Sequence, residues 1–300
     1  MKFYSLFLLL ALATVWGCGD PIKPTPTSHN LIFKIKFDST QVRLNNLGQP
    51  AAIPTGNAAQ TPKVNSIAAH YIEMTPTMYT PFGGGEVVYV GKQNTLGGSD
   101  AIDFDSLKKV ADGDVFYTIP LSEVKAGDYE YLRVSLAYEN GDIRFKYVHP
   151  SFPTSPFYFT GTLASFVGFN TYIRSFQVKT QTVTVNDDKL QGFWAFEIPA
   201  TPPYLPSAST QQGNAPTTTV VNPIASTSPI PAGSCVVTGA FANKLTITGN
   251  ETQDVIVTIS LSNNKSFEWQ EVNADGFFEP AAGETVTDMG IRGLIPSYTK

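Results

Sequence analysis

Four oxygen-bearing side chains stand close together near the C-terminal end of this 300-residue chain. Glu271, Asn273 and Asp275 occupy alternate positions, Gly276 follows the third, and Glu279 comes three residues after the glycine. Alternate side chains of an extended strand project from one face, and a bend at the glycine would turn the last acid toward the others. Carboxylate and amide oxygens are the ligands that calcium takes. These four residues are therefore the candidate metal ligands, and calcium is the candidate cofactor.

The stretch 271–279 resembles the first half of an EF-hand-type calcium loop. It departs from that loop in starting with Glu271 and in having Ala282 at the twelfth position, where a bidentate glutamate belongs. The same residues also fit a simpler interpretation, because Asp275-Gly276 is a favoured hairpin turn after a strand at 266–272. Both interpretations stay open from the sequence.

Aromatic side chains offer a second kind of site. Phe193, Trp194 and Phe196 lie in the run 190–198, and Trp269 lies in the run 267–272. A flat apolar ring face suits a sugar ring, which makes Trp194 and Trp269 the candidate ligand-binding residues. The alternative is a hydrophobic core, which the excess of phenylalanine over tryptophan and tyrosine favours.

Known catalytic patterns do not occur in the sequence. HExxH, GxSxG and a cysteine–histidine spacing for zinc are all missing, and the three histidines stand far apart at 29, 70 and 149. We therefore expect no catalytic residues and no enzymatic activity. The alternative is a secreted hydrolase whose carboxylates meet only in the folded chain.

The N-terminus carries an export signal. Lys2 precedes an apolar run from Phe3 to Trp16, which is too short to span a bilayer. Val15-Trp16-Gly17-Cys18 resembles the lipobox of bacterial lipoproteins, and the resemblance implies cleavage after residue 17 and lipid on Cys18. A plain signal peptide with an incidental cysteine is the alternative. The expected location is the cell envelope, at the outer membrane, with the membrane as partner through the lipid.

Charge and cysteine content exclude other classes. The formal net charge is −5, only 15% of residues are charged, and no cluster of lysine and arginine occurs. Nucleic acid is therefore excluded as a partner. Of the two cysteines, Cys18 is assigned to the lipid, so Cys235 has no disulfide partner and is predicted to be a small buried hydrophobe.

Alternating patterns predict an all-β fold, an antiparallel β-sandwich with two β-rich lobes. Apolar and polar residues alternate in 31–38, 129–138 and 255–261. We divide the chain into a signal peptide (1–17), a tether (18–30), a β-sandwich domain (31–198), a linker or long loop rich in proline, serine and threonine (199–232), and a smaller domain or continuation of the sandwich (233–300).

Two local predictions are sharper. Asn140-Gly141 between two alternating runs predicts a hairpin over 128–148, and acids followed by lysines predict a short helix over 103–110. For function we expect a lipid-anchored envelope lipoprotein with a non-catalytic binding or structural role and an envelope protein or glycan as partner. The alternatives are a glycan- or calcium-binding surface module and the hydrolase.

Overall fold

A computed structural model describes residues 29–199, 209–215 and 235–300. Within these ranges the regular structure is β-strand, interrupted by short 3-10 turns, and no α-helix occurs. The predicted all-β class is confirmed. Cys18 and the expected signal peptide and tether up to residue 28 lie outside the described residues.

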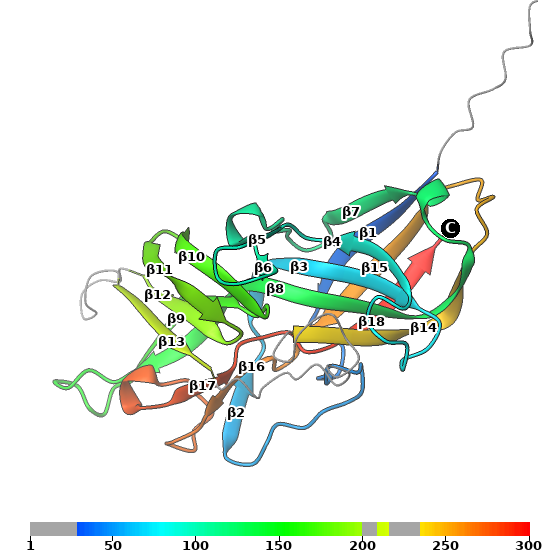
Figure 1. The fold of residues 1–300 in the computed structure, drawn as a ribbon. Helices are drawn as coiled ribbons and strands as arrows, with labels where there is room; N and C mark the ends of the chain where they lie inside the picture. Colours follow the sequence, from blue (N-terminus) through cyan, green and yellow to red (C-terminus); the bar gives the residue numbers. More distant parts are fainter. Residues whose placement is uncertain (1–28, 200–208, 216–234) are drawn as a thin grey trace, which may run out of the picture.

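One long strand, β8 (Gly127–Tyr147), is the axis of the largest sheet (Figure 1). Strand β3 (Lys63–Thr75) pairs with one edge of β8. The other edge is shared, because β14 (Cys235–Ile247) pairs with residues 127–136 and β9 (Phe157–Phe166) with residues 138–147. Beyond β9 lie β12 (Phe193–Ile198) and β13 (Ser209–Asn214), and beyond β3 lies β4 (Glu86–Val90).

Three smaller sheets complete the described fold. The first has the order β18 (Leu294–Thr299), β15 (Val255–Ser262), β1 (Asn30–Asp38), β7 (Val115–Pro120). The second has the order β17 (Thr285–Asp288), β16 (Phe267–Gln270), β2 (Asn57–Gln60). The third has the order β11 (Thr182–Leu190), β10 (Asn170–Gln177), β6 (Ala101–Ile102), β5 (Gln93–Asn94).

Apolar side chains of the large sheet enter two cores, one on each face. Leu132, Val134 and Leu136 of β8 pack with Phe33 of β1 and Val257 of β15 in one core. The opposite face packs against the sheet of β10 and β11, through Ala68, Tyr138, Ala164, Phe166, Ile173 and Val183. Leu136 and Tyr138 lie two residues apart but enter opposite cores, because the register of β3 on β8 shifts between Ala68 and Ala69, so the regular alternation predicted over 129–138 breaks before Tyr138.

Asn140-Gly141 is not a turn, so the predicted hairpin over 128–148 is wrong. Gly141 pairs with Val64 on one side and Leu163 on the other, and β8 runs straight through it. Asn140 is buried, and its Nδ2 donates to the carbonyl oxygen of Val178 at 2.8 Å. Pairing on both edges keeps this dipeptide extended, and its local turn preference is overridden.

Two further predictions need correction. The proline-rich stretch 199–232 is not loop throughout, since its proline-free segment β13 forms six pairs with β12, from Phe193–Asn214 to Ile198–Ser209. The helix expected over 103–110 is reduced to one 3-10 turn, η1 (Phe104–Ser106). Phe104 is buried in the second core, and the backbone is already extended at Leu107, so the helix does not continue.

The N-terminal and C-terminal segments share sheets. Strand β1 pairs in parallel with β15, β2 pairs with β16, and β14 pairs with β8. Cys235 opens β14 as a free, buried thiol, as predicted. In the part of the chain that is described, no helix has the length and apolarity needed to cross a membrane.

Candidate functional site

A pocket of about 240 Å³ lies between strands β12 and β13 and the segment 278–286 that leads into β17. Its walls are mostly apolar, with a smaller number of polar side chains among them. The lining residues are Leu163, Trp194, Phe196, Gln211, Gly213, Asn214, Phe278, Pro280, Glu284, Thr285 and Val286. A concave apolar site with a few convergent polar groups is the usual form of a small-molecule site.

The alternation of β12 places the tryptophan on the pocket side of the sheet. Phe193 and Ala195 enter the core shared with β10 and β11, so Trp194 and Phe196 project from the opposite face. Gly213 is paired with Trp194 across β12 and β13, and a Cβ at Gly213 would overlap the indole ring. The glycine therefore lets the half-buried indole lie across the neighbouring strand.

The polar groups of the pocket are mostly uncharged. Gln211, Asn214 and Thr285 carry amide and hydroxyl groups, and Glu284 is the one acid among the lining residues. Glu284 accepts backbone N–H bonds from Glu279 at 2.6 Å and Val272 at 3.2 Å. Burial raises the pKa of Glu284, and the neighbouring Glu271 adds to the rise.

One donor in the pocket wall has no acceptor. The buried indole Nε1 of Trp194 makes no hydrogen bond within the described residues. A buried donor left without a partner costs about 1–3 kcal/mol, and this atom is closed to solvent in the folded chain. The wall thus combines an aromatic ring with amide and hydroxyl groups, which suits a small, uncharged, hydroxyl-bearing ligand.

Trp269 lies in a different environment from Trp194. Its side chain is fully buried, with ring centroids 5.6 Å from Phe267 and 5.7 Å from Phe278. The expectation that Trp269 stacks on a ligand therefore does not hold. Through Phe278 it supports the pocket wall from behind.

The candidate calcium ligands are held by other contacts. Lys146 of β8 pairs with Asp275 and also with Glu279, the latter at 3.2 Å between Nζ and Oε1. Asn273 donates its side-chain amide to Glu279, and Glu271 accepts the backbone N–H of Asn273 at 3.1 Å. Within the described ranges, no group of three or more histidine, cysteine, aspartate or glutamate side chains is arranged to hold a metal ion. The calcium site stays a prediction, in a loop where an ammonium group already pairs with two of the acids.

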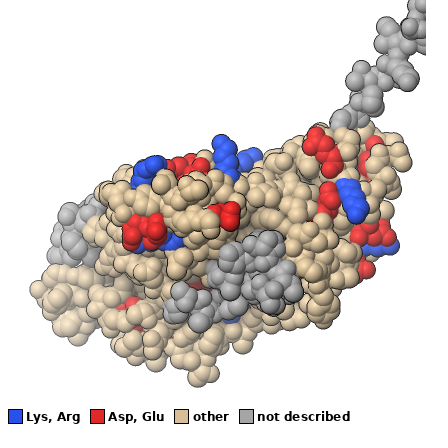
Figure 2. All heavy atoms as spheres, viewed as in Figure 1, with Lys and Arg blue, Asp and Glu red and all other residues tan. Residues whose placement is uncertain are grey.

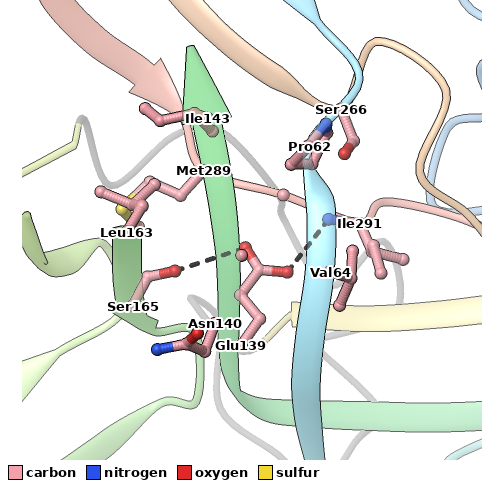
Figure 3. A pocket seen from close by; sticks show the side chains of 12 residues that line it. Pro62, Val64, Glu139, Asn140, Ile143, Leu163, Ser165, Ser266, Met289 and Ile291 are labelled. Atoms are coloured by element: carbon pink, nitrogen blue, oxygen red, sulfur yellow. Dashed lines mark hydrogen bonds between the residues drawn. The ribbon is translucent and has the colours of Figure 1, made fainter. Parts of the chain in front are cut away.

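Glu139 is a buried acid that the sequence did not indicate. It lies on β8 where the neighbouring strand changes from β14 to β9. Glu139 accepts hydrogen bonds from the backbone N–H of Ile291 at 3.1 Å and from the hydroxyl of Ser165 at 3.4 Å (Figure 3). Burial raises the pKa of Glu139 to about 8. A Cβ at Gly290 would overlap this carboxylate, so the glycine permits the close approach.

The cavities around Glu139 are too small for a substrate. The one drawn in Figure 3 has a volume of about 10 Å³, and one of about 20 Å³ lies on the side of Cys235 and Asp288. Each has room for about one water molecule. Two carboxylates, Glu139 and Asp288, line the second cavity, and Asp288 is paired with Arg292.

The chain has no match among protein-family models, curated proteins or solved structures. The arguments about function therefore rest on this chain's own residues.

Proposed function

We propose that the chain is a lipid-anchored lipoprotein of the bacterial cell envelope, at the outer membrane, whose folded part binds a small hydroxylated ligand such as a sugar ring without catalysing a reaction. The observation that carries the binding role is the Trp194 pocket. It combines an aromatic wall with amide groups and a hydroxyl group. The anchor rests on the sequence alone, through the apolar run and Cys18.

The geometry favours binding over hydrolysis. Hydrolysis of a glycosidic bond needs two carboxyl groups on opposite sides of the scissile bond. Among the described residues, Glu284 is the one acid that lines the pocket, and both of its oxygens accept backbone N–H bonds. A single acid held in this way can contribute to binding a hydroxyl group, but it leaves the pocket without the second carboxyl group.

The position of the pocket suits an anchored protein. The described chain enters at one end of the molecule, where β1 begins, and β12 and β13 lie toward the other end (Figure 1). A chain held to a membrane ahead of β1 would therefore carry the pocket away from the lipid.

Calorimetry of the full chain in detergent with a panel of neutral monosaccharides tests the binding role. We expect a dissociation constant near millimolar for at least one sugar, about −4 kcal/mol, with Trp194→Ala losing it. Trp194→Phe, which keeps a ring but removes the donor, should weaken binding less. Tyr158→Ala, an exposed aromatic outside the pocket, is the control. Equal binding by wild type and Trp194→Ala, or no binding of any neutral sugar, would refute the proposal.

Membrane partitioning tests the anchor. In a bacterial host, Cys18→Ser should move the chain from the detergent phase to the aqueous phase or leave it unprocessed, because the thiol is the atom that receives the lipid. Two acyl chains are needed for stable anchoring, at about 0.8 kcal/mol per buried methylene. Cys235→Ser, at the buried thiol, is the matched control. Unchanged partitioning of Cys18→Ser would exclude the lipid.

A further inference from the structure

A second hollow, distinct from the Trp194 pocket, is an open groove of about 430 Å³ between η1, β8 and β10. Its floor is aromatic and nearly fully buried: Phe104 makes edge contacts with Tyr138 at 5.8 Å and with Phe176 at 5.7 Å between ring centroids. Polar side chains form the rim, among them Ser66, Lys109, Ser175 and Gln177. The groove is thus an aromatic base surrounded by hydrogen-bonding groups.

Lys109 is the cation of this groove. Its Nζ lies 4.2 Å from the ring centroid of Tyr138 and 5.0 Å from that of Phe104, so the two rings fix the ammonium over the floor. It forms no ion pair with any carboxylate in the described ranges. Partial burial lowers the pKa of Lys109, while the carboxylate of Asp105 raises it in part.

The other charges beside the groove are already paired. Asp105 on the rim binds Arg174 at 2.9 Å, and Lys179, next to the rim, binds Asp142 at 3.0 Å. Figure 2 shows charged side chains of both signs gathered over β10 and β11 on this face of the molecule. Of the cations at this groove, Lys109 is therefore the one without a carboxylate partner among the described residues. The formal net charge of the protein is −5.

The rim also has free hydrogen-bonding capacity. Both atoms of the Asn140 amide already form hydrogen bonds, since its Nδ2 donates to Val178 and Tyr138 and its Oδ1 accepts from Asn65. The hydroxyls of Ser66 and Ser175 have no such contacts with described residues, and Gln177 uses its Nε2 on Lys179 while its oxygen stays available. These groups would bind hydroxyl groups of a ligand whose anionic end meets Lys109.

We infer that this groove binds a hydroxylated carboxylate, of the kind found in the uronic acid units of acidic glycans. The carboxylate pairs with Lys109, which the buried rings hold in place, and ring hydroxyls bond to Ser66, Ser175 and Gln177. The inference goes beyond the Trp194 pocket, because it concerns different residues and a charged ligand.

Titration of the full chain in detergent with galacturonic acid, and with glucose as the uncharged counterpart, tests the inference. Galacturonic acid should bind in the millimolar range, and added salt should weaken it because the contact with Lys109 is ionic. Lys109→Met keeps the apolar stem over the rings and should weaken binding at least about tenfold, or 1.4 kcal/mol. Lys109→Arg should retain binding, and Lys108→Met, at the exposed neighbour, should match wild type.

The same titration separates this site from the Trp194 pocket. Trp194→Ala should bind galacturonic acid like wild type, and Lys109→Met should leave the binding of neutral sugars unchanged. Circular dichroism confirms that each variant is folded. Absence of galacturonic acid binding, equal binding by Lys109→Met, or loss in Trp194→Ala instead would overturn the inference.

Discussion

The buried surroundings of Glu139 favour the neutral form of its carboxyl group. It is 6% exposed, its donors are one backbone N–H and one hydroxyl, and it makes no ion pair with a described residue. The nearby Cys235 thiol is also neutral, since burial raises its pKa, and Asp288 is already paired with Arg292. Ionisation of Glu139 would therefore place an uncompensated charge between β8 and the segment before β18.

Stability should fall with rising pH because of Glu139. Its pKa is about 8 in the folded chain against 4.5 for the ordinary group, so the folded state holds the proton more tightly. The loss begins above pH 4.5, is complete just above pH 8, and amounts to on the order of 5 kcal/mol. Glu139→Gln, which keeps the shape of the neutral form, should match wild type at pH 4.5 and be more stable at pH 9.

Urea unfolding at the two pH values measures this difference. Glu130→Gln, at an exposed position of the same strand, is the control and should leave the pH dependence of wild type intact. If Glu139→Gln lost stability between pH 4.5 and pH 9 as steeply as wild type, another group would be responsible.

Lys146 occupies the place where a cation would meet the acids of the 271–279 loop. Its ammonium pairs with Asp275 and Glu279, and these contacts raise the pKa of Lys146. Lys146→Met removes that charge and leaves the two acids to repel each other. We expect millimolar calcium to raise the melting temperature of Lys146→Met more than that of wild type, since saturating ligand at a hundred times its dissociation constant adds about 2.7 kcal/mol. Identical melting of Lys146→Met with calcium and with chelator would argue against any site in this loop.

At the scale of elements, one buried ion pair fastens the connection between β3 and β4. Arg133 of β8 pairs with Glu73 of β3 at 3.3 Å, and both side chains are inaccessible to solvent. Arg133 also donates to the carbonyl oxygen of Met78 at 3.1 Å and lies over the ring of Phe82, while Glu73 accepts the N–H of Gly85 at 2.7 Å. The pair therefore holds the connection 76–85 against the sheet.

Breaking this pair should be costly. Arg133→Met leaves Glu73 buried without its cation and frees the connection, so we expect a loss of about 3–5 kcal/mol in the free energy of unfolding. Proteolysis in the native state should become faster within 76–85. The double variant Arg133→Met with Glu73→Gln should recover part of the loss, because no buried charge remains. A loss below about 1 kcal/mol in Arg133→Met, the range of surface pairs, would show that the pair does not fasten this connection.

At the scale of the whole molecule, we expect the described parts of the chain to unfold as one cooperative unit. Residues before 199 and after 235 contribute side by side to one core, as in the parallel pairing of Leu31 with Val255 and of Phe33 with Val257. Neither part can keep its apolar face buried when the other unfolds. Separate unfolding of the segment 233–300 is therefore not expected.

Tryptophan fluorescence can follow the two parts separately. Trp194 reports on β12 and Trp269 on β16, so Trp194→Phe and Trp269→Phe each leave one folded-core reporter. In each variant, tryptophan fluorescence and circular dichroism should give the same urea midpoint. That shared midpoint should be lower in Trp269→Phe, because this substitution removes core packing. A fluorescence midpoint that departs from the circular dichroism midpoint would mean two independent units.

Local sequence was sufficient for properties that depend on a residue and its near neighbours. Alternation in 31–38 and 255–261 predicted strands that the structure confirms, and the apolar setting of Cys235 predicted a buried thiol. A strand's alternating faces follow from backbone geometry, which needs no knowledge of distant residues. The all-β class followed for the same reason.

Tertiary structure decided every feature that depends on which strands become neighbours. Asn140-Gly141 has the local preference of a turn, yet pairing on both edges of β8 keeps it extended. Trp194 and Trp269 look alike in sequence, but one lines a pocket and the other is buried behind Phe278. Glu139 occupies an ordinary polar position of a strand until β9, β14 and Gly290 surround it. Burial, pKa and pocket shape arise from contacts between residues far apart in the chain, and those contacts exist only in the folded molecule.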